Sequence, residues 1–177
     1  MSLFDLFRRG APSGGSTATE TDTVRKIIGA LDRMEPVRAK FLAAFAYLLS
    51  RAARADLEIS PEETGVMEGI VMRQGGLPAD QAVFVIQLAK TQNILFGATE
   101  NYLVTREFNE IATHEQKMHL LDCIYAVAAA DGSISTVEDN EISQIADELR
   151  IEHPDFISVR TRYRRQLAVL MDGGQND

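Results

Sequence analysis

Carboxylate and hydroxyl side chains are concentrated in one short stretch of the sequence, AAADGSISTVEDNE, which runs from residue 128 to residue 141. It combines an Asp-Gly turn at Asp131 with two serines and four acidic residues. Oxygen ligands at short spacing beside a tight turn suit hard divalent cations such as Ca²⁺ and Mg²⁺. The same residue types also end one helix and begin the next. The stretch therefore has two interpretations, a cation site and a helix boundary.

A related stretch occurs 75 residues earlier in the chain. The segment ARADLEISPEETGVMEGI (53–70) aligns with AAADGSISTVEDNEISQI (128–145), and both contain the pattern A-D-x-x-I-S-x-x-E. Self-similarity at a fixed offset indicates a repeated structural unit. The pattern predicts two related helical hairpins, with two further helices between them.

Part of the shared pattern is typical of a helix start. Ser60 is followed three residues later by Glu63, and Ser135 is followed in the same way by Glu138. In such a capping box the serine oxygen accepts the third amide, and the glutamate accepts the serine's own amide. One cap contributes about 1 kcal/mol. These four residues are therefore explained without a metal ion.

The two aspartates of the pattern have no such simple explanation. Asp56 and Asp131 follow Ala-rich helical segments, where the helix dipole disfavours a carboxylate by roughly 0.3–1 kcal/mol. Each could accept an amide two residues on and shape the turn, or each could bind a cation. A calcium loop of the EF-hand type is excluded, because Thr136 and Ile142 occupy its required glycine and glutamate positions. A cation site would need ligands from more than one loop or helix.

The elements that must position these residues are predicted to be helices. Apolar residues recur at steps of three and four, and no segment alternates as a strand would. The stripes include Val37, Phe41, Phe45; Val66, Ile70; Phe108, Ile111; Leu121, Tyr125; Ile142, Ile145; and Val159, Tyr163, Leu167, Leu170. Prolines stand where helices would begin, at Pro36, Pro61, Pro78 and Pro154. We predict an all-α compact bundle of seven to eight helices built around the two hairpins.

Composition limits the classes of function. The 177 residues carry a formal charge of −8 and no tryptophan, which argues against nucleic acid as a partner. Cys123 is the only cysteine, which excludes an intramolecular disulfide and fits a reducing compartment. The N-terminus lacks a secretory h-region, and no window is apolar enough to cross a membrane. We therefore expect a cytoplasmic protein.

The ends of the chain differ in composition from its middle. Residues 1–21 are predicted to be a flexible N-terminal segment and linker, residues 22–172 a helical domain, and residues 173–177 a disordered tail. The first residues include LFDLF, whose apolar side chains can share one helical face. This segment is either a loosely docked terminus or a short anchor for a partner or for peripheral contact with a membrane.

The A-D-G-x-I-S-x-x-E block inside a helical hairpin resembles the tellurite-resistance TerB-like family, which also includes the N-terminal region of some membrane-anchored DnaJ-like proteins. The resemblance covers roughly residues 23–170 and is strongest at 130–145. It implies a compact all-helical domain, linked to tellurite and general stress responses, with no established catalysis.

The resemblance also implies a metal site built from the acidic residues of the motif. Carried over to this sequence, its ligands are Asp56, Glu63, Asp131 and Glu138, and the cofactor is a divalent cation. The first copy departs from the family pattern, because Leu57-Glu58 replaces the Asp-Gly turn.

Three other features suggest chemistry. His153-Pro154-Asp155 is the tripeptide by which J-domains stimulate chaperones. In J-domains a basic helix precedes this tripeptide, whereas the preceding residues here, IADELRIE, are not basic. A helix start is therefore the simpler interpretation. His119 and Cys123 lie four residues apart without an evident orienting group for a nucleophile. Arg160, with three further arginines up to residue 165, forms either a solvated face or a docking surface for an acidic partner or an acidic part of the same domain.

Two function hypotheses follow from these features. The first is a TerB-like, non-enzymatic stress-response protein that binds a divalent cation through the paired acidic motifs. The alternative is a protein-protein interaction module, an adaptor or co-chaperone, without metal chemistry. No residue constellation supports an enzyme, and protein partners are expected under either hypothesis.

Overall fold

The computed structural model describes residue 26 and residues 29–52, 61–95 and 101–168. Within these ranges the chain is helical and contains no strand, which confirms the predicted all-α class. The helices are α3 (Pro36–Ala52), α4 (Pro61–Arg73), α5 (Ala79–Leu95), α6 (Asn101–Ile111), α7 (His114–Ala128), α8 (Thr136–Glu148) and α9 (His153–Arg162).

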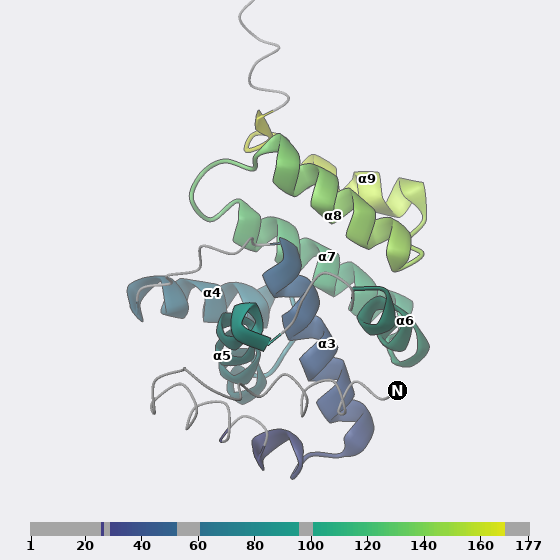
Figure 1. The fold of residues 1–177 in the computed structure, drawn as a ribbon. Helices are drawn as coiled ribbons and strands as arrows, with labels where there is room; N and C mark the ends of the chain where they lie inside the picture. Colours follow the sequence, from purple (N-terminus) through teal and green to yellow (C-terminus); the bar gives the residue numbers. More distant parts are fainter. Residues whose placement is uncertain (1–25, 27–28, 53–60, 96–100, 169–177) are drawn as a thin grey trace, which may run out of the picture.

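Helix α3 lies in the middle of the structure (Figure 1). It packs against α5 and α6 and also contacts α7 and α8. Helix α4 lies beside α5, and α8 and α9 form an outer layer over α7. The two helix pairs that carry the acidic motifs, α3–α4 and α7–α8, therefore meet around α3.

The sequence of α3 explains its central place. Twelve of its 17 residues are buried, because its second half, FLAAFAYLLS, is almost entirely apolar. Phe41 stacks on Phe108 of α6 with ring centroids 5.3 Å apart, and Phe45 lies 6.0 Å from Phe41. A helix that is apolar on all sides is stable only when neighbours cover it.

Prolines mark helix starts as predicted, and a glycine pair follows one helix end. Pro36 and Pro61 are the first residues of α3 and α4, and Gly75-Gly76 follows the end of α4. The bounds of α4 and α8 are related by the offset of the sequence repeat, since 136 − 61 = 75 and 148 − 73 = 75. Gly97, which the sequence places at a helix end, Leu170 of the last apolar stripe, and the terminal segments 1–21 and 173–177 lie outside the described residues.

Two details of the apolar stripes were predicted wrongly. Val37 and Val66 are 52% and 57% exposed, although both fit the spacing of buried neighbours. Val37 lies in the first turn of α3, and Val66 lies at the edge of the buried face of α4, where periodicity alone cannot decide. The last helix also ends earlier than its stripe suggested, at Arg162, and Leu167 is buried after it in an isolated bridge.

Candidate functional site

The acidic loop of the second copy connects α7 to α8. Helix α7 is followed by Ala129 in its C-cap, and Gly132 has a φ of +99°, a value that L side chains rarely adopt. Asp131 is exposed, and its Oδ1 accepts the backbone N–H of Ser133 at 3.1 Å. This bond is an Asx turn, the structural alternative considered for the aspartate. It engages one of the two carboxylate oxygens.

The start of α8 is the predicted capping box. The Oγ of Ser135 accepts the N–H of Glu138 at 3.2 Å, while Oε2 of Glu138 accepts the N–H of Ser135 at 2.8 Å and its hydroxyl at 2.7 Å. Glu138 is half-buried and uses the same oxygen for both bonds. Its main contact is therefore with its own helix end.

The loop is held on its far side by the C-terminal part of the chain. The N–H of Ile134 donates to the carbonyl of Gln166 at 2.6 Å, and its carbonyl accepts the N–H of Ala168 at 2.9 Å. These bonds make an isolated parallel bridge between Ile134 and Leu167, whose side chains are both almost fully buried. The residues after α9 thus fix the position of the acidic loop.

The described residues bring together only part of the predicted metal site. Asp56 lies outside them, and Glu63 lies in the first turn of α4, where its side chain is not described. Asp131 and Glu138 each keep one oxygen without a hydrogen bond in the described structure. The described ranges contain no group of three or more His, Cys, Asp or Glu side chains placed to hold a metal ion. Since Ca²⁺ takes six to eight oxygen ligands, this copy alone supplies too few.

A buried ionic network lies next to the acidic loop. Asp139 is 8% exposed and accepts the hydroxyl of Tyr125 at 2.9 Å and the guanidinium of Arg160 at 2.6 to 3.1 Å. Burial, and then the neighbouring Asp139, raises the pKa of Tyr125. The hydrogen bonds to Asp139 also raise the pKa of Arg160. This network ties α7, α8 and α9 together through one carboxylate.

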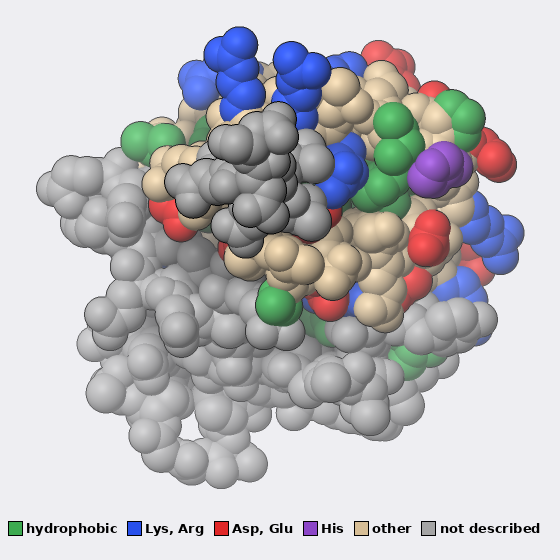
Figure 2. Space-filling view, turned by 90° about the horizontal axis from the view of Figure 1, so that it is seen from above, with side chains coloured by type: hydrophobic (Ala, Val, Ile, Leu, Met, Phe, Trp, Pro, Cys, Tyr) green, Lys and Arg blue, Asp and Glu red, His purple; other side chains and the backbone are tan. Residues whose placement is uncertain are grey.

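Two of the four arginines at the end of the chain are thereby explained. Arg160 pairs with Asp139, and Arg162 lies 3.3 Å from Asp122 of α7, whose carboxylate also accepts the hydroxyl of Tyr163 at 2.9 Å. These arginines contact an acidic part of the same domain, one of the alternatives considered above. Figure 2 shows Lys and Arg side chains at the upper edge, near the middle and on the right side of this face, with Asp and Glu side chains at several places among them.

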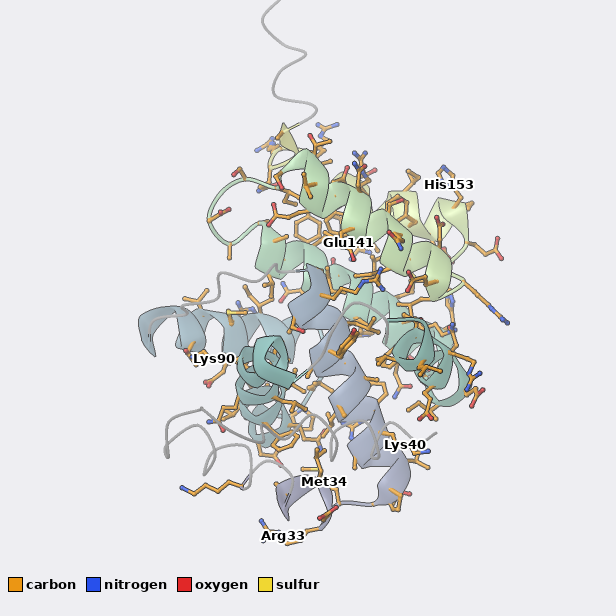
Figure 3. The ribbon with its side chains drawn as sticks, in the orientation of Figure 1. Arg33, Met34, Lys40, Lys90, Glu141 and His153 are labelled. Atoms are coloured by element: carbon orange, nitrogen blue, oxygen red, sulfur yellow. The ribbon has the colours of Figure 1, made fainter. Side chains whose placement is uncertain are left out.

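A second ion cluster joins the two helix pairs. The guanidinium of Arg51, at the end of α3, lies 2.5 Å from Glu141 and 2.7 Å from Glu148, and its side chain is 8% exposed. Figure 3 shows Glu141 on α8 above the end of α3. Burial raises the pKa of Glu148, but the hydrogen bonds from Arg51 outweigh this effect and leave the pKa lowered. Arg51 thus anchors the helix that leads into the first acidic motif.

Sequence reasoning did not identify these two clusters. Asp139 stands in the run EDNE, which is typical of a solvent-exposed helix face. Its burial depends on Arg160, a partner 21 residues away that the local sequence does not indicate. Arg51 left a better signal, because it is a charged residue near the end of an otherwise apolar helix.

The other sequence features have structural roles. Cys123 is fully buried, and burial raises the pKa of its thiol, which disfavours the thiolate that a nucleophile needs. His153 begins α9, Pro154 occupies its first turn and Phe156 is buried, as expected for a helix start. Asp155 lies 3.2 Å from His114 of α7, so the tripeptide contacts its own domain.

One comparison with known proteins identifies the family. The family model described as tellurite resistance protein TerB matches residues 41–161, about two thirds of the chain. The chain belongs to the TerB family. The matched range includes both acidic motifs and the Asp139 network. No curated protein and no solved structure matches the chain.

Proposed function

We propose that this TerB-family chain is a non-catalytic, cytoplasmic stress-response protein that acts in tellurite resistance by binding rather than by chemistry. The observation that carries the proposal is the family match over residues 41–161. The chemistry of the side chains supports it, because the sole cysteine is buried and its thiolate disfavoured. None of the described helices is long and apolar enough to cross a membrane.

A survival assay tests the tellurite role. Cells that lack this protein are grown with and without tellurite, and are then supplied with wild type or with the Asp139→Ala variant. Wild type is expected to restore growth, and the variant to restore it less because its fold is weakened. Equal tellurite sensitivity with and without wild type would contradict the proposal.

We also propose that the paired acidic motifs bind a divalent cation. The support is the exposed Asp131 at the C-terminal end of a helix, where the dipole disfavours its charge, and its counterpart Asp56 in the first copy. Asp131 and Glu138 each have one carboxylate oxygen left for a cation. The ligand set would be completed by Asp56, Glu63 and water.

Calorimetric titration with Ca²⁺, Mg²⁺, Mn²⁺ and Zn²⁺ tests this site. The double variant Asp56→Asn/Asp131→Asn is expected to lose the heat of binding that wild type shows. The matched control is Asp80→Asn/Asp147→Asn, which removes the same charge from exposed positions on α5 and α8. If both double variants behave like wild type with every cation, no motif site exists.

A second candidate function is a protein-binding module without metal chemistry. It is favoured by large apolar side chains on outer helix faces, of which Val66 of α4 is the most exposed at 57%. A pull-down compares wild type with Val66→Glu and with a chain that lacks residues 1–20. A partner that is lost with either change supports this candidate, and a partner set that neither change alters counts against it.

A further inference from the structure

A cavity of about 220 Å³ lies beside the N-terminal part of α3. It is lined by Arg38, Phe41, Gly75, Gly76, Leu77, Glu115, Gln116 and His119. These residues come from α3, from the turn between α4 and α5, and from α7. Three separate parts of the chain therefore line one small cavity, in which charged and polar side chains stand beside apolar ones.

Among the described residues, Arg38 is held in place without an anionic partner. Its guanidinium lies 5.0 Å from the ring centre of Phe41 and donates a hydrogen bond to Gln81 of α5. Within the described residues no carboxylate forms an ion pair with it. A guanidinium that is already ordered loses little further freedom when it binds a carboxylate or phosphate-type group.

His119 is also oriented at the cavity. Its Nδ1 lies 3.0 Å from the carbonyl oxygen of Gln74, and because a carbonyl oxygen only accepts, Nδ1 is the donor of this bond. The close fit depends on Gly76, whose φ is +65° and where a Cβ would lie 2.9 Å from Nδ1. The turn thus places the imidazole against the backbone and keeps the cavity open.

Helix orientation adds positive potential. Arg38 is in the first turn of α3, Leu77 lies just before α5, and Gln116 is in the first turn of α7. The cavity therefore adjoins the N-terminal ends of three helices, and each such end carries partial positive charge. The opposing charge is Glu115, whose side chain is 85% exposed and lies 3.8 Å from Nε2 of His119. Water and salt screen an exposed charge of this kind.

We propose that this cavity binds a small anion with carboxylate or phosphate-type oxygens. The guanidinium of Arg38 holds the oxygens, and His119, Phe41 and Leu77 contact the rest of the ligand. A ligand of few atoms makes few contacts, so the affinity is expected in the millimolar range. The cavity shares no lining residue with the acidic motifs.

NMR titration of the full chain tests the proposal, with acetate, butyrate and inorganic phosphate as separate probes. The expected result is saturable shifts of the Gly75 and Gly76 amides and of the His119 ring. Preference for butyrate over acetate indicates an organic carboxylate, and preference for phosphate indicates an inorganic oxyanion.

Three variants separate a site from a general charge effect. Arg38→Gln is expected to weaken binding about tenfold, because a charge-assisted bond is lost. Glu115→Gln is expected to tighten binding by about two- to fivefold, since an exposed opposing charge is removed. Arg164→Gln, a change at an exposed arginine away from the cavity, should leave the affinity unchanged.

Arg38→Gln is expected to weaken binding and Glu115→Gln to strengthen it. Because the two expected changes in affinity are opposite, the test remains decisive even if Arg38→Gln lowers the stability of the fold. Glu115 is on the surface, so its variant is expected to fold like wild type. Absence of saturable shifts with all three probes would overturn the proposal. Equal effects of Arg38→Gln and Arg164→Gln would overturn it as well.

Discussion

The helix pairs α3–α4 and α7–α8 occupy matching places in the sequence but are stabilised by different forces. The first pair is built on α3, most of which is buried among apolar side chains. The second pair is built on α7 and α8, and only four residues of α8 are buried, one of which is the charged Asp139. The first acidic motif therefore follows a helix buried in the apolar core, whereas the second pair adds a buried ionic network to the apolar packing of α7 and α8.

Individual positions show how this difference arises. At the offset of 75, Tyr125 corresponds to Ser50 and Asp139 corresponds to Thr64. Ser50 donates to the carbonyl of Tyr47 within its own helix, and Thr64 accepts a hydrogen bond of 2.7 Å from Lys90 of the neighbouring helix α5. Figure 3 shows Lys90 on α5 beside α4. In the second pair, the larger side chains of Tyr125 and Asp139 form hydrogen bonds that connect α7 and α8 to Arg160 of α9.

This comparison teaches which residues can be free for function. In the second copy, Asp139 and Glu138 already serve the fold, and Ile134 is held by the residues after α9. Asp131 is exposed in this fixed loop, and its carboxylate, like that of Glu138, keeps one oxygen without a hydrogen bond in the described structure. The acidic run thus contains the buried Asp139, which serves the fold, and two candidate ligands, of which Asp131 is the more exposed.

The largest effect is expected from removing the buried carboxylate. Asp139→Ala should lower the free energy of unfolding by about 3 kcal/mol, because it leaves the guanidinium of Arg160 and the hydroxyl of Tyr125 without their partner. Thr64→Ala, at the matching position, should cost about 1 kcal/mol. Urea unfolding of both variants measures the difference. Equal losses would show that the two pairs are held alike.

A slightly smaller effect is expected at the C-terminal bridge. Leu167→Ala should cost about 2–3 kcal/mol and should speed hydrogen exchange at the amide of Ile134, which donates across the bridge. Arg165→Ala, at an exposed neighbour, is the matched control and should change neither quantity. Unchanged exchange at Ile134 in the Leu167 variant would mean that the loop is held by other contacts.

The sequence predicted the helices and the cap because both depend on local patterns. Glu138 follows Ser135 at the spacing that a capping box requires, and prolines mark the helix starts. The role of Asp139 and the bridge between Ile134 and Leu167 could not be predicted, because each depends on a partner more than 20 residues away. The exposure of Val66 depends in the same way on which face of α4 its neighbours cover.

A smaller effect tests the ion cluster between the pairs. The pKa of Glu148 is lowered from its ordinary value of 4.5, so its contribution to stability is present above that pH and is lost as the pH falls through the lowered value. Glu148→Gln should cost about 1 kcal/mol at neutral pH. The difference in free energy of unfolding between wild type and this variant should disappear as the pH falls below about 4.5. Urea unfolding at a series of pH values measures it. A gap that is independent of pH would contradict the role of this carboxylate.

The most direct test of the account is whether a divalent cation stabilises the fold through Asp131. Urea unfolding of wild type, Asp131→Asn and Glu138→Gln is measured with and without Ca²⁺, Mg²⁺, Mn²⁺ or Zn²⁺. A cation that binds only the folded chain should raise the free energy of unfolding of wild type by about 1 kcal/mol at several times its dissociation constant. Asp131→Asn should abolish this gain. Equal gains in wild type and Asp131→Asn, or no gain in wild type with any of the four cations, would contradict the account.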